Sequence, residues 1–200
     1  MKKSKTLLII LLISTLAGSL NLFAGEHPSE NLRPVFTKSQ SENANDDKLL
    51  DAASRGNLQG VKDALNNGAN INAQGGFDFT AILIAAHFGH LNVVEYMTEK
   101  HPSLVTGEAG NLTPLHTAAM SGELKIIKFL AKKYPSSLTA KTSLGHTAMH
   151  FAATGGHTDI VKLLSQENPS LLNEKTLDKE PPCTWQQNMG MSQQSRLSQR

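Results

Sequence analysis

A ten-residue pattern of polar and apolar positions occurs four times along this chain of 200 residues. Each copy opens on a polar residue, contains a pair of adjacent alanines, and closes on a glycine. The copies lie at 47–56, 80–89, 113–122 and 147–156, so the closing glycines are 33 or 34 residues apart. A nearly constant period of this length predicts a solenoid of stacked supersecondary units instead of one globular core.

The clearest copy, 113–122 (TPLHTAAMSG), predicts a short helix with defined ends. The hydroxyl of Thr113 can cap the first turn, and Pro114 fits the first helical position, where a backbone donor would have no partner. The two alanines that follow allow neighbouring helices to approach closely. Gly122 then ends this helix.

A second, amphipathic helix is predicted after the glycine. In residues 123–132 four apolar side chains lie roughly on one side of that helix: Leu124, Ile127, Phe129 and Leu130. The pattern recurs at 91–97 and 160–164, and a proline closes each of these helices, at position 102, 135 or 169. Helices this short cannot bury their apolar side alone, so the units must stack.

The Thr-Pro-Leu-His motif at 113–116, the repeat period and the stretch 66–72 (NNGANIN) resemble those of ankyrin repeats. The resemblance implies an all-α fold, an ankyrin-repeat solenoid of about four helix-turn-helix units with β-hairpin-like loops. The repeats would occupy 46–74, 75–106, 107–140 and 141–176 of a domain at 46–179. In the first repeat, a terminal capping unit, the first helix would expose Lys48, Asp51 and Arg55.

The residues before the repeats predict export. Residues 1–24 combine a lysine-rich start, an apolar run at 7–23 and a final alanine, which is the layout of a secretory signal peptide. Cleavage after Ala24 would make the protein secreted or periplasmic, and the short lysine-rich signal is of bacterial type. An uncleaved membrane anchor is the alternative, because the run approaches the roughly 20 residues of a bilayer span. Residues 25–45 are polar, contain two prolines, and predict a disordered linker.

Composition changes this picture little. The chain is 39% hydrophobic, 18% charged and 5% aromatic, which suits one domain. Its formal net charge of +2 includes three lysines of the predicted signal peptide. The remaining chain is nearly neutral and offers no electrostatic basis for binding nucleic acid. Cys183 is the only cysteine, which excludes an intramolecular disulfide.

The histidines do not predict a metal site. His116 and His150 occupy the fourth position of the motif, where the ring commonly bonds the backbone of the neighbouring turn, and His90 and His157 follow the closing glycines. Residues spaced by the repeat period form a row instead of a converging ligand set. His87 is outside these positions and is expected to be exposed. We therefore expect no metal and no cofactor.

Catalytic motifs are also missing from the sequence. It contains no Gly-x-Ser-x-Gly elbow, no His-Glu-x-x-His motif and no phosphate-binding glycine loop. The prediction is a protein without enzymatic activity. An enzyme with an unrecognised site on the concave face is the weakest alternative.

In ankyrin-like stacks, the loop tips and the solvent side of the first helices form a concave face where partners usually bind. The resemblance places the following residues on that face: Arg55, Phe77, Asp78, Phe79, His87, Phe88, Glu108, Leu112, Met120, Ser121, Thr142, Ser143, His146 and Thr154. Three phenylalanines, at 77, 79 and 88, stand out as aromatic anchors for a partner. Alternatively, one or two of them pack between the first two repeats.

The sequence thus predicts an exported, monomeric, non-catalytic module that binds another protein through its concave face. The alternative is a membrane-tethered scaffold that uses residues 6–23 as an anchor.

The tail, 180–200, fits neither a repeat nor a usual linker. The period places the start of a fifth repeat at position 180 or 181. In the neighbouring reading frame, each codon combines the third base of one codon with the first two bases of the next. Read this way, the codons of Trp185 and Gln186 must give an alanine codon, and those of Met189 and Gly190 must give a glycine codon. Both fall where a fifth repeat needs them. The tail is therefore interpreted as a frame-shifted fifth repeat, the alternative being a chance match in a polar, disordered tail.

Overall fold

The computed structural model describes residues 36–39, 43–106 and 111–176. The predicted signal peptide, most of the predicted linker, Glu108 and the predicted frame-shifted tail lie outside these ranges. The described part is all-α, as predicted, and it contains no named β-strand. An isolated antiparallel bridge between Gln74 and Thr80 closes the loop of the second repeat.

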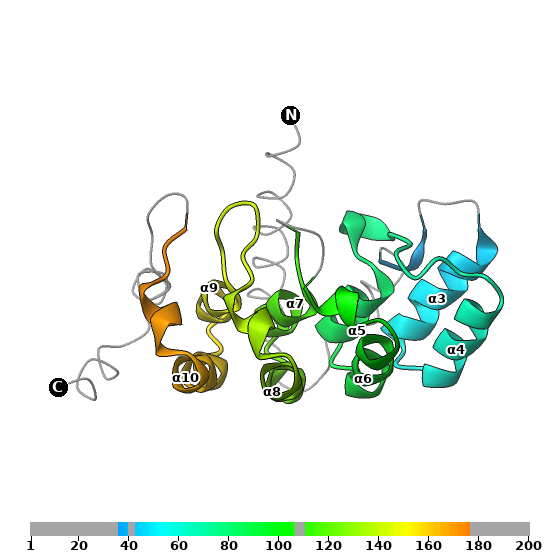
Figure 1. The fold of residues 1–200 in the computed structure, drawn as a ribbon. Coiled ribbons are helices and arrows are strands. Elements are labelled where there is room, and N and C mark those ends of the chain that lie inside the picture. Colours follow the sequence, from blue (N-terminus) through cyan, green and yellow to red (C-terminus); the bar gives the residue numbers. More distant parts are fainter. Residues whose placement is uncertain (1–35, 40–42, 107–110, 177–200) are drawn as a thin grey trace, which may run out of the picture.

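Each repeat contributes a first and a second helix. The four pairs of the described chain are α3 (Ala44–Ser54) with α4 (Leu58–Asn66), α5 (Ala81–His87) with α6 (Leu91–Lys100), α7 (Pro114–Ser121) with α8 (Leu124–Lys133), and α9 (Ala148–Thr154) with α10 (Thr158–Glu167). The first helices pack side by side in one layer and the second helices in another, and the loops between repeats extend beyond the first helices (Figure 1).

Helix α7 begins and ends as the sequence predicts. The Thr113 hydroxyl accepts a hydrogen bond from the His116 N–H at 3.3 Å, and Pro114 occupies the first turn of α7. Gly122 ends α7 with a φ of 82°, a left-handed conformation that glycine adopts without steric cost. Local chemistry therefore sets the bounds of this helix.

The three prolines after the second helices each begin a 3₁₀ helix. These are η2 (Pro102–Val105), η3 (Pro135–Thr139) and η4 (Pro169–Asn173). A proline suits the first turn of such a helix, because its missing N–H would have no partner there. In the second repeat the additional 3₁₀ helix η1 (Gly76–Asp78) forms the loop tip before α5.

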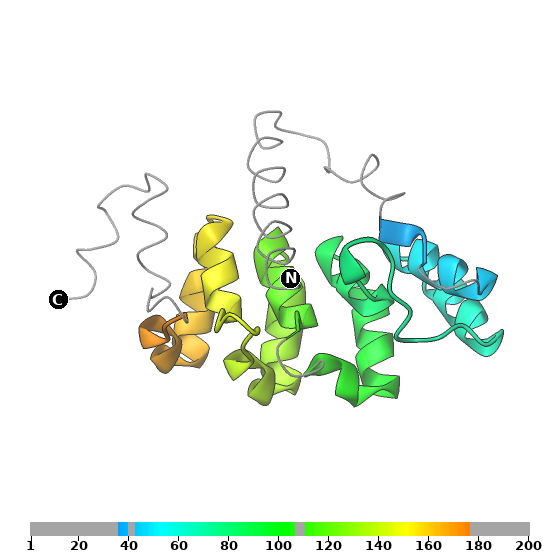
Figure 2. The same ribbon diagram turned by 90° about the horizontal axis from the view of Figure 1, so that it is seen from above.

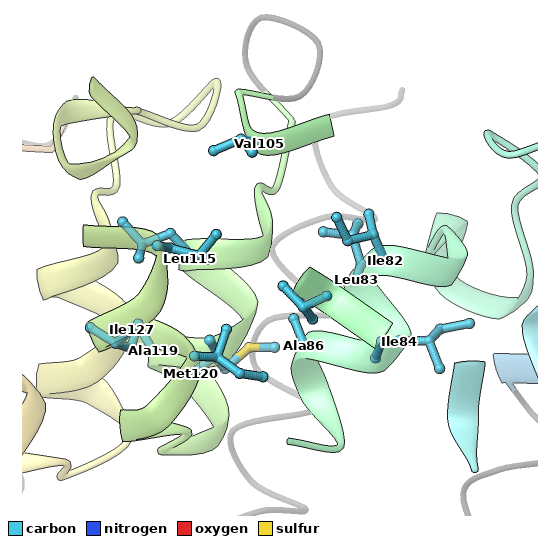
Figure 3. Packing of buried hydrophobic residues seen from close by; sticks show 14 of the residues in the cluster. Ile82, Leu83, Ile84, Ala86, Val105, Leu115, Ala119, Met120 and Ile127 are labelled. Atoms are coloured by element: carbon cyan, nitrogen blue, oxygen red, sulfur yellow. The ribbon is translucent and has the colours of Figure 1, made fainter. Parts of the chain in front are cut away.

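The core runs continuously through the stack. Ala118 and Ala119 of α7 are fully buried, and α7 packs between α5 and α9. Met120 of α7 reaches toward Ala86 of α5 (Figure 3). The small alanines keep the first helices close together, and larger side chains such as Ile127 of α8 fill the space between the two layers.

Polar contacts between repeats reinforce this packing. His90 Nε2 lies 2.8 Å from the carbonyl oxygen of Ser54, and His157 Nε2 lies 3.1 Å from that of Met120. Each ring crosses to the preceding repeat and lies where its closing glycine leaves room: a Cβ on Gly122 would stand 2.6 Å from the His157 ring. The glycine period therefore serves helix termination and repeat stacking together.

The first repeat starts earlier than predicted. Helix α3 begins at Ala44, two residues before the predicted boundary. The Asn43 side chain accepts from the Asn45 N–H, and Asn45 Nδ2 donates to the Asn67 carbonyl at 2.7 Å. Asparagine is also common in linkers, so the sequence did not distinguish these capping residues from the linker, and the predicted start of the repeat came too late. Within the described ranges, no helix has the length and apolar character needed to cross a membrane.

Candidate functional site

The predicted contact residues that the structure describes lie along the loop tips and first helices of the stack. Seen from above, the first helices form one row with the inter-repeat loops beside it (Figure 2). Arg55 and Ser143 are exposed, and Asp78 stands exposed at the tip of η1. Six others are partly buried: Phe77, His87, Phe88, Leu112, Ser121 and Thr142. Thr154, at the end of α9, is partly buried as well.

Three of the predicted contact residues are buried, and their placement on an open face is wrong. Phe79 is 1% exposed, Met120 is 8% exposed and His146 is 9% exposed. Phe79 packs at the base of the η1 loop and Met120 lies between α5 and α7, so both belong to the core. The alternative that one of the phenylalanines packs between the first two repeats therefore holds for Phe79.

An aromatic cluster lies at the junction of the first two repeats, with Phe36 at its centre. The centroid of the Phe36 ring is 5.3 Å from that of Phe79, 5.5 Å from His87, 5.7 Å from Phe77 and 5.9 Å from Phe88. These separations fall in the range of favourable aromatic pairs. We call the four rings around Phe36 the aromatic cradle; all four come from η1, α5 and the residues that follow them.

Phe36 belongs to the segment predicted to be a disordered linker, and that prediction is wrong for this residue. Phe36 is 2% exposed, and its segment lies beside the first helix pair (Figures 1 and 2). Its carbonyl oxygen occupies the space beside Gly75, where a Cβ would stand 1.8 Å away. The Ser39 N–H donates to Asp47 Oδ1 at 2.5 Å. The sequence signal that could have indicated this contact was one phenylalanine within a mostly polar stretch.

The loop that carries part of the cradle has an unusual backbone. Phe77 and Asp78 have φ values of 59° and 60°, a left-handed conformation that costs a non-glycine residue about 1–3 kcal/mol. The loop is closed by the Gln74–Thr80 bridge and by the Gly75 N–H, which donates to the Phe79 carbonyl at 2.9 Å. These contacts hold the two residues in place and direct the Phe77 ring toward Phe36.

His87 connects the cradle to the third repeat. Its Nδ1 lies 2.6 Å from Ser121 Oγ, within hydrogen-bonding distance. Burial lowers the pKa of His87 from 6.5 to about 4, so its imidazole is neutral at pH 7 and a weak base. The prediction that His87 is exposed is therefore wrong, because the neighbouring rings surround it.

The motif histidines bond the backbone, as predicted. The Thr113 N–H donates to His116 Nδ1 at 3.1 Å, so Nε2 carries the proton and donates to the Ala140 carbonyl at 3.0 Å. Burial lowers the pKa of His116 to about 4, although the bond to Ala140 acts in the opposite direction. His150 Nδ1 accepts from the Thr147 N–H in the same way. In the part of the chain that the structure describes, no three His, Cys, Asp or Glu side chains gather as metal ligands.

Comparison with known proteins gives a clear result for the repeats. A family model described as ankyrin repeats (3 copies) matches residues 49–142. A model described as ankyrin repeat matches residues 144–176. Together the two matches extend from α3 to η4. No curated protein matches the sequence.

Proposed function

Because the chain belongs to the ankyrin-repeat family, whose repeats generally mediate binding to other proteins, we propose that it is an exported, non-catalytic module that binds a protein through its concave face. The proposed surface comprises the η1 loop, the loop tip at 142–145, and the solvent side of the first helices. Its core would be the partly buried rings of Phe77 and Phe88.

One observation carries this proposal: partly buried aromatic side chains gather beside a loop with a strained backbone. Backbone strain of this kind concentrates at functional sites, because the fold alone gains nothing from it. Aromatic residues, phenylalanine included, are also enriched in protein interfaces. The η1 loop combines both features, since Phe77 is one of the two strained residues and its ring belongs to the cradle.

Site-specific photo-crosslinking tests the surface. A photoreactive amino acid is placed at Asp78, at Ser143 and, as a control, at Lys128, which is exposed on α8 in the layer of second helices. We expect crosslinks to one protein from Asp78 and Ser143 but not from Lys128. A partner that crosslinks equally from all three positions, or from Lys128 alone, would contradict the concave-face proposal.

Binding to the crosslinked partner then tests the aromatic anchors. The double variant Phe77→Ala/Phe88→Ala is expected to bind the purified partner at least tenfold more weakly, a typical loss for interface anchors. Phe129→Ala is the matched control, because this partly buried phenylalanine lies on α8. Equal binding by the double variant would remove the two rings from the interface.

Export is the part of the proposal that depends on residues 1–24. Their basic start and apolar run support a cleaved signal peptide and a secreted or periplasmic protein. Mass spectrometry of the protein isolated from its source organism measures the N-terminus directly. We expect Gly25 as the first residue; an intact Met1 in the membrane fraction would favour the tethered scaffold instead.

A further inference from the structure

We propose that the aromatic cradle is a binding site for a phenylalanine side chain on a peptide segment, and that Phe36 occupies it as an internal ligand until the partner's phenylalanine replaces it. The inference rests on the proposed function and adds to it the chemistry of the partner and a means of regulation. Phe77, Phe79, His87 and Phe88 would recognise the ring.

Phe36 contacts the repeats as a ligand would. Phe36 is buried, whereas Lys38 is exposed and Thr37 and Ser39 are partly buried, so Phe36 is the most deeply inserted of these four residues. The four rings that receive it all come from a different part of the chain, within residues 77–88. Protein interfaces use the same arrangement, in which an anchor side chain fills a well-packed pocket on the partner.

The cradle is held in place by contacts that do not involve Phe36. The Gly75 N–H donates to the Phe79 carbonyl, and the Gln74–Thr80 bridge fixes the base of the loop. His87 is held by Ser121 Oγ at 2.6 Å, from the next repeat. These contacts hold the Phe79 backbone and the His87 ring independently of Phe36.

Gly75 extends the recognition from the side chain to the backbone. Its φ is −91°, which alanine can adopt, yet a Cβ here would stand 1.8 Å from the Phe36 carbonyl oxygen. The Phe36 carbonyl carbon is 3.0 Å from that Cβ position, and the nearest atom outside Phe36, Leu50 Cδ1, is 3.2 Å away at the flexible end of a side chain. Glycine at this position thus makes room for the backbone of the inserted segment.

Covalent attachment explains why Phe36 fills the cradle. Only a short stretch of chain separates Phe36 from α3, and a short tether gives an effective concentration in the millimolar range. A free peptide must compete with this concentration, so its apparent affinity falls in proportion to the fraction of empty cradles. A partner that also contacts the rest of the concave face can overcome this competition.

The test uses a fluorescent peptide with the sequence of residues 31–42 and the full chain as receptor. We expect the peptide to bind the Phe36→Ala chain at least about tenfold more tightly than the unaltered chain. A peptide in which Phe36 is replaced by alanine should not bind. The double variant Phe36→Ala/Gly75→Ala should lose the peptide, because its new Cβ meets the peptide backbone. Phe36→Ala/Phe129→Ala, the matched control, should keep it.

A second measurement follows the ring at position 36 in a chain that keeps all its other side chains. With 4-fluorophenylalanine at position 36, millimolar unlabelled peptide should shift the fluorine resonance of the full chain toward its solvent-exposed value. An unchanged resonance, or equal peptide affinity of the Phe36→Ala and unaltered chains, would overturn the proposal. So would a Phe36→Ala chain that no longer folds, because Phe36 would then be part of the core.

These outcomes are separable from those for the proposed function. Crosslinks from Asp78 and Ser143 without any peptide binding would retain the concave surface and overturn the internal ligand. Peptide binding without those crosslinks would support the phenylalanine site and contradict the wider protein-binding face.

Discussion

At the scale of single residues, the buried histidines connect stability to pH. His116 is fully buried, and its Nδ1 accepts a hydrogen bond from the Thr113 N–H. A proton added to Nδ1 would remove that acceptor and place a charge in the core. Protonation of His87 would likewise place a charge among the phenylalanine rings.

We predict that the free energy of unfolding falls as the pH decreases from about 6.5 to about 4. The pKa of His116 is about 4 in the folded chain and 6.5 for an unperturbed histidine, so the unfolded chain binds more protons in this window. The stabilisation is complete above pH 6.5 and is lost as the pH approaches 4, at up to about 1.4 kcal/mol per pH unit. Burial gives His87 a second contribution of the same sign.

Denaturant unfolding at a series of pH values measures this effect. The His116→Gln variant should be less stable at pH 7, because the Thr113 and Ala140 contacts are disturbed, but its stability should change less between pH 6.5 and 4. Equal pH dependence in the two proteins would show that His116 does not titrate in this window.

At the scale of helices, the small residues of α7 determine how closely the repeats stack. Ala119 is fully buried on α7, which packs between α5 and α9, and it lies beside Ile127 of α8 (Figure 3). Its methyl group is enclosed on every side, since none of it is exposed to solvent. A larger side chain must displace one of the neighbouring helices or leave its preferred rotamer.

Ala119→Leu is therefore predicted to lower the free energy of unfolding by about 1–3 kcal/mol, the usual cost of overpacking. Lys125→Leu is the matched control: it adds a leucine at an exposed position of α8 and should change stability by less than about 0.5 kcal/mol. Chemical denaturation of both variants gives the comparison. An unaltered midpoint for Ala119→Leu would refute the tight contact.

At the scale of the whole molecule, stability depends on the number of neighbours that each repeat has. In a solenoid the free energy is approximately a sum of repeat and interface contributions. Helix α5 packs against both α3 and α7, and α7 packs against both α5 and α9. Within the described ranges, α3 has one such first-helix neighbour.

Amide hydrogen exchange should follow this order. We predict the slowest exchange in α5 and α7, close to the rate set by global unfolding, and faster exchange in α3. Mass spectrometry of peptides covering 44–54 and 114–121 provides the measurement. Exchange in α3 as slow as in α7 would indicate one cooperative unit instead of a stack with weaker ends.

The sequence by itself determined the features of this protein that depend on local chemistry. The glycine period, the Thr113 cap, the turn prolines and the backbone contact of His116 could be predicted because each involves a few residues close in the chain or repeated in every unit. The period of the pattern then determined the solenoid, since helices this short must stack.

Only the tertiary structure decided which aromatic side chains are accessible. Phe77 and Phe79 are two residues apart in the same loop, yet Phe79 is in the core and Phe77 is partly buried. Phe36 looked like a linker residue until the fold brought it among rings more than 40 positions away in sequence. Burial of such side chains depends on neighbours that no local pattern specifies, which is why the cradle and its occupant were found only in three dimensions.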